Sequence, residues 1–368
     1  MKKLHPYSTN AAYQINSKTH SLQRAVADRV GHLYLKQGEL AKSFLLHNPL
    51  ENLEETASLE LLESVLFFLN KKNKNKFEEL LMSRTQDLRN NYKPIEYINF
   101  LIGMFHLQQR SYTLAIDYFK DNDIGSTFHL GIEGHISRLV FSNGTKAWQN
   151  GQNRRPMLDI HALKDSVYLD PIFELNGQNS LSRLELSQVM LNLTRLTKSD
   201  TIWHKKLAFY LMANYYFNTS IAGYYRGHFQ GVSNRSNHYH YQKRLAAVDL
   251  ISSDSIYNLE YINRYDYIYL GHLDQSRFYY EKTIAHSDDT ELNARCHFMI
   301  AQIEQFEYLQ SEAYVGTPSS KRFYDGSINE TSDKYLKSLS TFKDRYGKTS
   351  FYQEIIKECS FFRYYYSD

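Results

Sequence analysis

The sequence predicts an all-α fold, a right-handed solenoid of antiparallel helix pairs that becomes irregular in its middle. Apolar residues recur at helical spacing, as at the i, i+3, i+4 and i+7 positions between Tyr112 and Phe119. Expected turns at Gly38, Asn75 and Arg110 are 37 and 35 residues apart, close to the ~34-residue period of one common helix-pair repeat. Only 16 glycines and 6 prolines occur in 368 residues, which argues against the many tight turns of an all-β fold.

The clearest helix pair is expected between Tyr97 and Lys120, where two short helices would fold back on each other around residues 108–111. Gly103 and Ala115 are the small residues that let the two backbones approach closely. A small residue in each helix, with aromatic residues at fixed offsets, resembles one tetratricopeptide repeat. The resemblance implies a stack of such units that binds other proteins.

The chain is expected to have three parts: N-terminal helical repeats over residues 1–125, an irregular helical junction over 126–180, and C-terminal helical repeats over 181–368 that end in a capping helix. In the first part, Pro94 suits the first turn of a helix because its missing N–H is not needed there. The run KKNKNK, Lys71 to Lys76, is interpreted as a solvated turn rather than a phosphate-binding patch. In the junction, one helical stretch is expected from Phe128 to Phe141.

Helical periodicity returns in the third part, from Leu181 to Leu196 and from Ile202 to Phe217. The second of these helices is apolar on two faces, one of them including Trp203, so it is expected to be buried between neighbours. Five residues near the start of the next helix repeat tetratricopeptide-like offsets found earlier in the chain: Tyr267, Gly271, Leu273, Ser276 and Tyr280. Further helices are expected over 292–309, 333–346 and 351–366.

Capping boxes are predicted at the start of two of these helices. Asp288 with Glu291 would begin one, and Ser350 with Gln353 would begin the last. The final segment, Phe351–Asp368, is interpreted as a structural cap rather than a partner-binding tail, because its apolar residues form a single stripe.

The third part also resembles a group of uncharacterised bacterial proteins with degenerate repeats of this type. Three stretches carry the resemblance: LTKSDTIWHKKLAFYLMANYYFNTSIAGYY, FYYEKTIAHSDDTELNARCHFMIAQIEQFEY and TSFYQEIIKECSFFRYYY. The group is mostly exported and longer, with no assigned activity, so the resemblance implies no catalytic residue here. It makes this chain compatible with being a piece of a longer exported protein.

Composition excludes several classes of function. The formal charge of +3, from 43 basic and 40 acidic residues, lacks the concentrated basic field that a nucleic-acid partner requires. Cys296 and Cys359 are too few for a disulfide framework and are expected to be buried thiols. The first residues contain no apolar run typical of a signal peptide, and no segment is apolar for long enough to span a membrane.

Histidine clusters are the candidate metal sites. His238 and His240 would share one side of an extended segment, and His228 could complete an open zinc site. No cysteine or carboxylate nearby supports this, so polar loop histidines are the preferred interpretation. A second cluster, His129, Glu133 and His135, is weaker because His135 would point to another side of a helix.

Residues 224–244 mix aromatic and basic side chains, which can stack on and pair with sugars or single-stranded nucleic acid. If any loop binds a ligand, this segment is the one expected to do so. The candidate binding residues are Tyr224, Tyr225, Arg226, His228, Arg235, His238, Tyr239 and His240.

The leading hypothesis is a non-catalytic scaffold or adaptor, expected to be a monomer, that binds a peptide or protein segment on its concave face without any cofactor. Two alternatives remain: a carbohydrate- or nucleic-acid-binding module that uses residues 224–244, and a metal-dependent enzyme centred on His228, His238 and His240. Fold alone does not choose among them.

Overall fold

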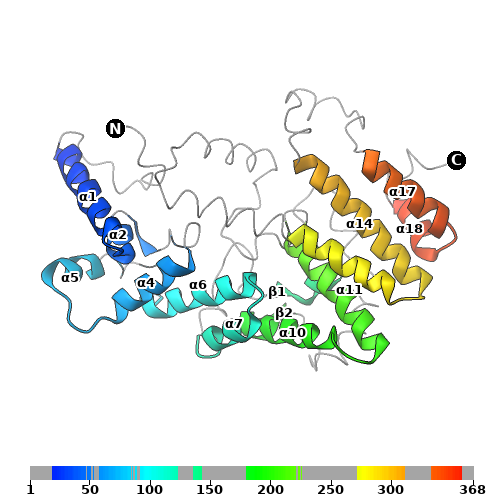
Figure 1. Cartoon of the computed structure of the whole chain (residues 1–368), viewed down its shortest axis with the longest axis horizontal. Helices are drawn as coiled ribbons and strands as arrows, with labels where there is room; N and C mark the ends of the chain where they lie inside the picture. Colours follow the sequence, from blue (N-terminus) through cyan, green and yellow to red (C-terminus); the bar gives the residue numbers. More distant parts are fainter. Residues whose placement is uncertain are drawn as a thin grey trace. The chain divides into compact units, whose positions relative to one another are not determined.

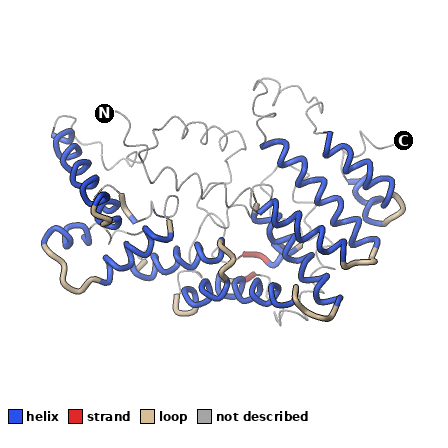
Figure 2. Tube along the Cα trace, viewed as in Figure 1, coloured by secondary structure: helices blue, strands red, loops and turns tan. Residues whose placement is uncertain are grey.

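The computed structural model describes residues 19–46, 48–50, 53, 58–83, 85, 88, 92–122, 136–142, 180–220, 223, 225, 272–310 and 333–358. These residues are mostly helical, 78% of them lying in helices, as Figures 1 and 2 show. The chain forms two compact units: unit 1 contains residues 1–128 and 247–264, and unit 2 contains residues 129–246 and 265–368.

Unit 1 contains six described helices, the last two of which form the helix pair expected between Tyr97 and Lys120. They are α1 (Thr19–Lys36), α2 (Leu40–Leu45), α4 (Leu59–Asn70), α5 (Lys76–Ser83), α6 (Pro94–Gln108) and α7 (Tyr112–Phe119). Pro94 occupies the first turn of α6, as predicted. The predicted close approach between α6 and α7 is also confirmed: a Cβ atom added to Gly103 would lie 2.7 Å from the Phe119 ring, and Ala115 is fully buried.

Two turns of unit 1, between α1 and α2 and between α6 and α7, have the same backbone geometry at positions 72 residues apart. Gly38 has φ +74° and Arg110 has φ +62°, the left-handed conformation that often ends a helix. The matching hydrogen bonds run from Gly38 N–H to Leu35 O and Glu39 N–H to Tyr34 O, and from Arg110 N–H to Leu107 O and Ser111 N–H to His106 O. The two helices α1 and α6 therefore end in the same turn conformation.

The turn between α4 and α5 differs from these two, so Asn75 is not equivalent to Gly38 and Arg110. Asn75 instead caps α5, because its Oδ1 accepts hydrogen bonds from the N–H groups of Phe77 and Glu78. Two lysines of this turn bind groups of the protein itself. Lys71 forms an ion pair of 2.7 Å with the buried Glu78, and the Lys74 ammonium donates to the carbonyls of Leu69 and Lys71 at the end of α4.

Unit 2 is built around the helix α11 (Ile202–Thr219), whose residues 206–219 are all buried. This confirms that the helix lies between neighbours. It packs against α10 (Arg183–Leu196) and against the short 3-10 helix η4 (Arg138–Phe141). Ring contacts join it to a helix of residues 272–285: Tyr216 lies 5.3 Å from His272, and Phe209 lies 5.3 Å from His286 just beyond that helix.

The expected helix from Phe128 to Phe141 is wrong for its described part. Residues 136–137 form strand β1 (Ile136–Ser137), which pairs antiparallel with β2 (Ser180–Leu181), and η4 follows directly. The reason is tertiary. The backbones of Ile136 and Ser137 pair with Leu181 and Ser180, so their polar groups are not available to a helix. The carbonyls of residues 140–142 are then bound by the side-chain amides of Asn214 and Asn218.

The C-terminal helices are α14 (Thr290–Gln310), α17 (Asp333–Tyr346) and α18 (Ser350–Glu358). Both predicted capping boxes are wrong. Asp289, not Asp288, caps α14 by accepting from the N–H groups of Glu291 and Leu292. The carboxylate of Glu291 instead reaches the N-terminus of α18, 59 residues further along the chain.

At that N-terminus the Glu291 carboxylate accepts the N–H groups of Ser350 at 2.7 Å and Phe351 at 3.0 Å. The hydroxyl of Thr349 accepts the N–H of Tyr352. Ser350 therefore is not the capping side chain, because two acceptors that are better placed already satisfy the first turn of the helix.

Candidate interaction surface

The segment that the sequence favours as a binding loop lies almost entirely outside the described residues. Only Tyr225 is described, and it is buried, with an exposed fraction of 3%. Its backbone N–H donates to the carbonyl of Asn218 at 2.8 Å. The remaining predicted binding residues, which the structure does not describe, are Tyr224, Arg226, His228, Arg235, His238, Tyr239 and His240.

The C-terminal end of α11 carries a buried network of hydrogen bonds that leads up to this segment. The amide of Asn218 donates to the carbonyls of Val140 and Ser142 at 2.9 and 2.8 Å. A Cβ atom at Gly223 would lie 2.1 Å from the Asn218 carbonyl oxygen, so the chain can turn back over α11 only with glycine there. This network fixes where the segment begins, and Tyr225 belongs to the core.

Arg183 and Tyr215 are the most strongly perturbed titratable groups of unit 2. Burial lowers the pKa of the Arg183 guanidinium to about 10, so the group stays protonated at neutral pH. Burial also raises the pKa of the Tyr215 hydroxyl, which has no hydrogen-bond partner among the residues that the structure describes. A tyrosine that is kept neutral and closed off from solvent is poorly suited to acid–base catalysis, so we assign this pair to the core.

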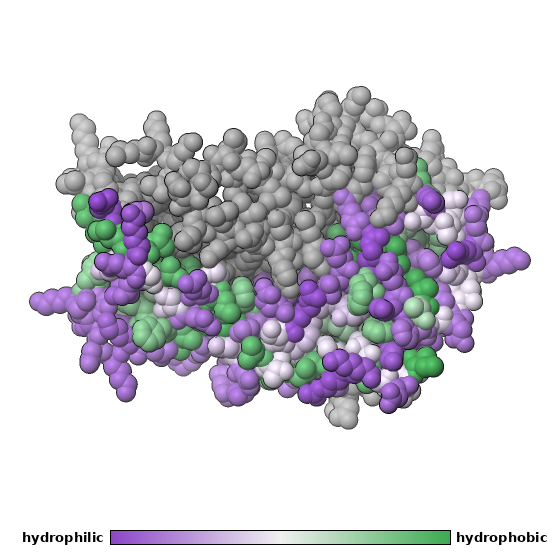
Figure 3. All heavy atoms as spheres, in the orientation of Figure 1, coloured by the Kyte–Doolittle hydropathy of each residue, from purple (hydrophilic) through white to green (hydrophobic). Residues whose placement is uncertain are grey.

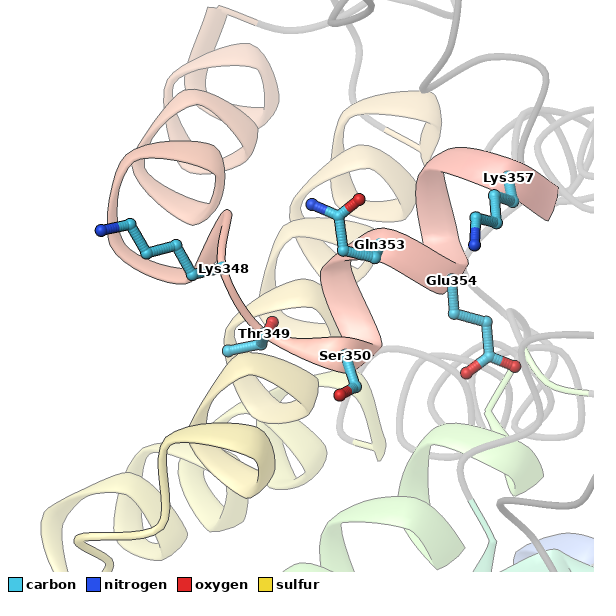
Figure 4. Close-up of a pocket in the computed structure, with 6 residues that line it drawn as sticks. All are labelled: Lys348, Thr349, Ser350, Gln353, Glu354 and Lys357. Carbon is cyan, nitrogen blue, oxygen red and sulfur yellow. The ribbon is translucent and has the colours of Figure 1, made fainter.

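A shallow hollow of about 400 Å³ lies at the turn between α17 and α18. Figure 4 shows that the side chains around it project in different directions and do not converge on one point. The backbone donors beside it, at Ser350 and Phe351, are already bound by Glu291. The hollow therefore offers no set of groups that could hold a small ligand. It is lined by Lys348, Thr349, Ser350, Gln353, Glu354 and Lys357.

The most distinctive surface of unit 2 lies along α11 and the helix of residues 272–285. Three large apolar side chains are exposed there: Ile202 by 67%, Trp203 by 45% and Phe278 by 45%. Together with the rings that connect them, we call this set the aromatic face: Ile202, Trp203, Phe209, Phe278, Tyr279 and His286. Exposed apolar groups gathered on neighbouring elements are typical of interaction sites.

Ring contacts connect four members of the aromatic face. Phe278 contacts Tyr279 at 5.1 Å, Tyr279 contacts Phe209 at 6.1 Å, and Phe209 contacts His286 at 5.3 Å. Ile202 is seven residues before Phe209, which places both on one side of α11. Because Tyr279 also stacks on the buried Tyr216 at 5.7 Å, the exposed rings rest on a firmly packed base.

Lysine side chains cover part of two exposed rings. The Lys206 ammonium lies 5.1 Å from the centre of the Trp203 ring, and the Lys282 ammonium lies 5.3 Å from the centre of the Phe278 ring. Such cation–π contacts hold the rings in place. Figure 3 shows hydrophobic residues interspersed with hydrophilic ones over the described part of the face in view.

Sequence reasoning missed this surface because it assigned Trp203 to a buried stripe of the helix. The structure places Trp203 in the first turn of α11, where one flank of the helix lies in solvent. A usable signal was present in the sequence: Ile202 and Trp203 directly precede His204, Lys205 and Lys206. Adjacent apolar and basic residues at a helix start are typical of an end that projects beyond its neighbours.

The described residues contain no group of three or more histidine, cysteine or acidic side chains placed to hold a metal ion. His129, Glu133 and His135 lie outside the described part of the chain. Cys296 is a buried thiol, and Cys359 lies outside the described residues. No helix within the described ranges has the length and apolarity needed to cross a membrane.

The chain was compared with known proteins at three levels. No protein-family model, curated protein or solved structure matches it. Its function must therefore be argued from the geometry of its own residues.

Proposed function

We propose that the chain is a non-catalytic interaction scaffold, built as a tetratricopeptide-like array of antiparallel helix pairs, that binds a peptide or protein segment. The observation that carries this proposal is the aromatic face, where Ile202, Trp203 and Phe278 are exposed on closely packed helices. Tryptophan, tyrosine and phenylalanine supply a large share of the binding energy in protein interfaces.

The helical framework supports the same proposal. The repeated turn geometry at Gly38 and Arg110 is what stacked helix pairs with similar loops would show. In unit 2, contacts of Tyr216 with His272 and of Phe209 with His286 fit two neighbouring helices that run in opposite directions. An array of this kind has a concave face, where each helix pair adds one strip of side chains that a bound segment can contact.

Site-directed photo-crosslinking tests the proposal. A photoreactive benzoylphenylalanine replaces Phe278, and the protein is irradiated in a lysate of its source organism. We expect a crosslinked protein that disappears when Ile202→Ser and Trp203→Ala are introduced together. Because these side chains are exposed, the double variant should lose less than about 1 kcal/mol of stability, which a thermal melt verifies.

The matched control places the same photoreactive group at Phe67 of α4, which is exposed by 77% in unit 1. It should not capture the same protein. A crosslink that survives the double variant, or that forms equally from Phe67, would show that the aromatic face is not the binding surface and would overturn the proposal.

A further inference from the structure

Two histidines connect their helices to the next helix through the ring of a tyrosine. His106 of α6 stacks on Tyr118 of α7, with ring centres 5.5 Å apart. His297 of α14 lies 5.2 Å from Tyr346 of α17. Burial lowers the pKa of both imidazoles, because the charged form loses solvation there. The same kind of helix contact therefore occurs in both units.

The two histidines differ in the charge beside them. The carboxylate of Glu63 raises the pKa of His106, against the effect of burial. The guanidinium of Arg345 on α17 acts in the same direction as burial and lowers the pKa of His297 further. A protonated imidazole is attracted to the face of a tyrosine, but both histidines have that attraction. The fold therefore resists protonation of His297 more than protonation of His106.

His297 lies beside the apolar contact that holds the last two described helices. Tyr346 is 9% exposed and Phe342 is fully buried. The Phe342 ring contacts Phe298 of α14 at 5.7 Å and Phe351 of α18 at 6.2 Å. Protonation of His297 would place a charge at the edge of these packed rings, where a charge that is not neutralised is costly.

The other charged groups of the helices packed here have different neighbours. Glu291 of α14 binds the backbone of α18, and Arg295 lies over an aromatic ring of α18. Arg277, from the helix of residues 272–285, pairs with Glu304. Further charged side chains of α17 and α18, none of them buried, are Lys337, Lys343, Asp344, Lys348, Glu354 and Lys357.

We propose that the contact between α14 and α17 is an acid-sensitive switch, in which protonation of His297 beside Arg345 separates α17 and α18 from α14. The separation would uncover the rings of Phe298 and Phe342. This regulation goes beyond the proposed binding function and does not depend on it.

The lowered pKa of His297 fixes the direction of the response. Because the closed interface disfavours the charged imidazole, its stability is fully present above pH 6.5 and is lost as the pH falls from 6.5 through the lowered pKa. At a pH below both values, each pKa unit between the open and the closed state increases the open population about tenfold. One measured pKa therefore predicts the size of the response.

Cys296 can report the opening, because its thiol is fully buried next to His297. Burial raises the pKa of the Tyr346 hydroxyl and Cys296 raises it further, which places the thiol at the same interface. The thiol should become reactive when α17 moves away. Dithiodipyridine, which reacts with thiols in acid, is the probe, and mass spectrometry measures labelling at this cysteine alone.

Labelling of the full chain is followed from pH 7 to pH 5, a range above the ordinary carboxyl pKa of about 4.3. A short unfolded peptide with one cysteine corrects for the reagent's own pH dependence. NMR of the unmodified protein measures the pKa of His297. We expect a value below 6.5, and we expect corrected labelling of Cys296 to rise in acid by the factor that this value predicts.

Three variants make the result specific. His297→Gln stays neutral and should remove the rise in labelling. Arg345→Gln should reduce the rise, because the imidazole loses its positive neighbour. His106→Gln is the matched control, since His106 has the same ring contact in unit 1, and it should leave the labelling of Cys296 unchanged.

A His297 pKa at or above 6.5 would overturn the inference, as would corrected labelling that does not rise in acid or a rise that persists in His297→Gln. The NMR measurement and the labelling both use the unmodified protein, so they decide the matter even if a variant folds poorly.

Discussion

The hydroxyl of Tyr280 donates a hydrogen bond of 2.6 Å to Oδ1 of Asn214. The amide of Asn214 in turn donates to the carbonyl of Phe141 at 2.8 Å. One buried asparagine thereby connects the helix of residues 272–285, α11 and η4. A fully satisfied network of this kind specifies how three segments pack, and leaving one member unsatisfied is costly.

Tyr280→Phe should destabilise unit 2 by about 1–3 kcal/mol, because Oδ1 of Asn214 would be left without its donor in the core. Tyr215→Phe is the matched control on α11, since the Tyr215 hydroxyl is buried without a partner, and its removal should be neutral or stabilising. Urea denaturation of both variants measures the difference. Equal losses of stability in the two variants would show that the hydrogen bond from Tyr280 to Asn214 does not stabilise the fold.

Glu78→Gln should destabilise unit 1 by roughly 2 kcal/mol, because hydrogen bonds to a charged carboxylate would be lost. Hydrogen bonds from Lys71 and from the Asn75 N–H lower the pKa of Glu78 to about 2. A lowered pKa stabilises the fold above the ordinary carboxyl pKa of 4.5, and that stabilisation is lost as the pH falls towards 2. Stability measured against pH should show the variant and the original protein converging in acid.

Glu96→Gln is the control for that experiment. Glu96 pairs with Lys93 at 2.7 Å, but the two side chains are exposed by 39% and 78%. Losing this exposed ion pair should lower the free energy of unfolding by less than about 1 kcal/mol. A similar cost for both substitutions would contradict the role assigned to the buried pair.

Gly38→Ala should destabilise the first helix pair by about 1 kcal/mol, because alanine is strained at a φ of +74°. No atom lies within 4 Å of the added Cβ, so the loss of stability comes from backbone strain and not from a steric clash. Gly38→Asn should cost less, since asparagine tolerates the left-handed conformation better. Thermal melts of the two variants test whether the alanine variant is the less stable one. A smaller loss of stability for alanine than for asparagine would refute the prediction.

Glu291→Ala should loosen α18, because the N–H groups of Ser350 and Phe351 would lose their acceptor. We expect a loss of about 1 kcal/mol, with faster hydrogen exchange at those two amides. Glu281→Ala, at an exposed position on the preceding helix, is the control. Unchanged exchange in the Glu291 variant would show that the carboxylate does not hold the helix.

A chain that ends at Gly347 should melt at a clearly lower temperature. Phe351, Tyr352 and Ile355 are each 3% exposed, and burying a large apolar side chain contributes roughly 1.5–3 kcal/mol. The Phe351 ring also covers Phe298 and Phe342. An unchanged melt combined with loss of a binding partner would instead identify the segment as a recognition tail.

Features set by neighbouring residues could be predicted from the sequence. Pro94, Gly103 and Ala115 occupy the expected places because a helix start and the contact within one helix hairpin depend on residues of one short stretch of chain. The acceptor for the α18 N-terminus could not be predicted in this way, because Glu291 lies 59 residues before Ser350.

The candidate surface was harder to predict than the fold. An apolar pattern shows that a helix has two apolar sides, but it does not show where its neighbours end. Trp203 thus resembled a core residue in sequence although nearly half of it is exposed. The helix expected from Phe128 to Phe141 was wrong for a similar reason, since Ile136 and Ser137 pair with the distant residues Leu181 and Ser180 as a strand.

The matching turns at Gly38 and Arg110 would allow the chain to become shorter or longer between them. Both turns begin from the same backbone geometry and the same hydrogen bonds. A recombination event that joined the sequence before one turn to the sequence after the other would remove or duplicate 72 residues while recreating an existing junction. Losing or duplicating this stretch would therefore require no new turn conformation at the junction.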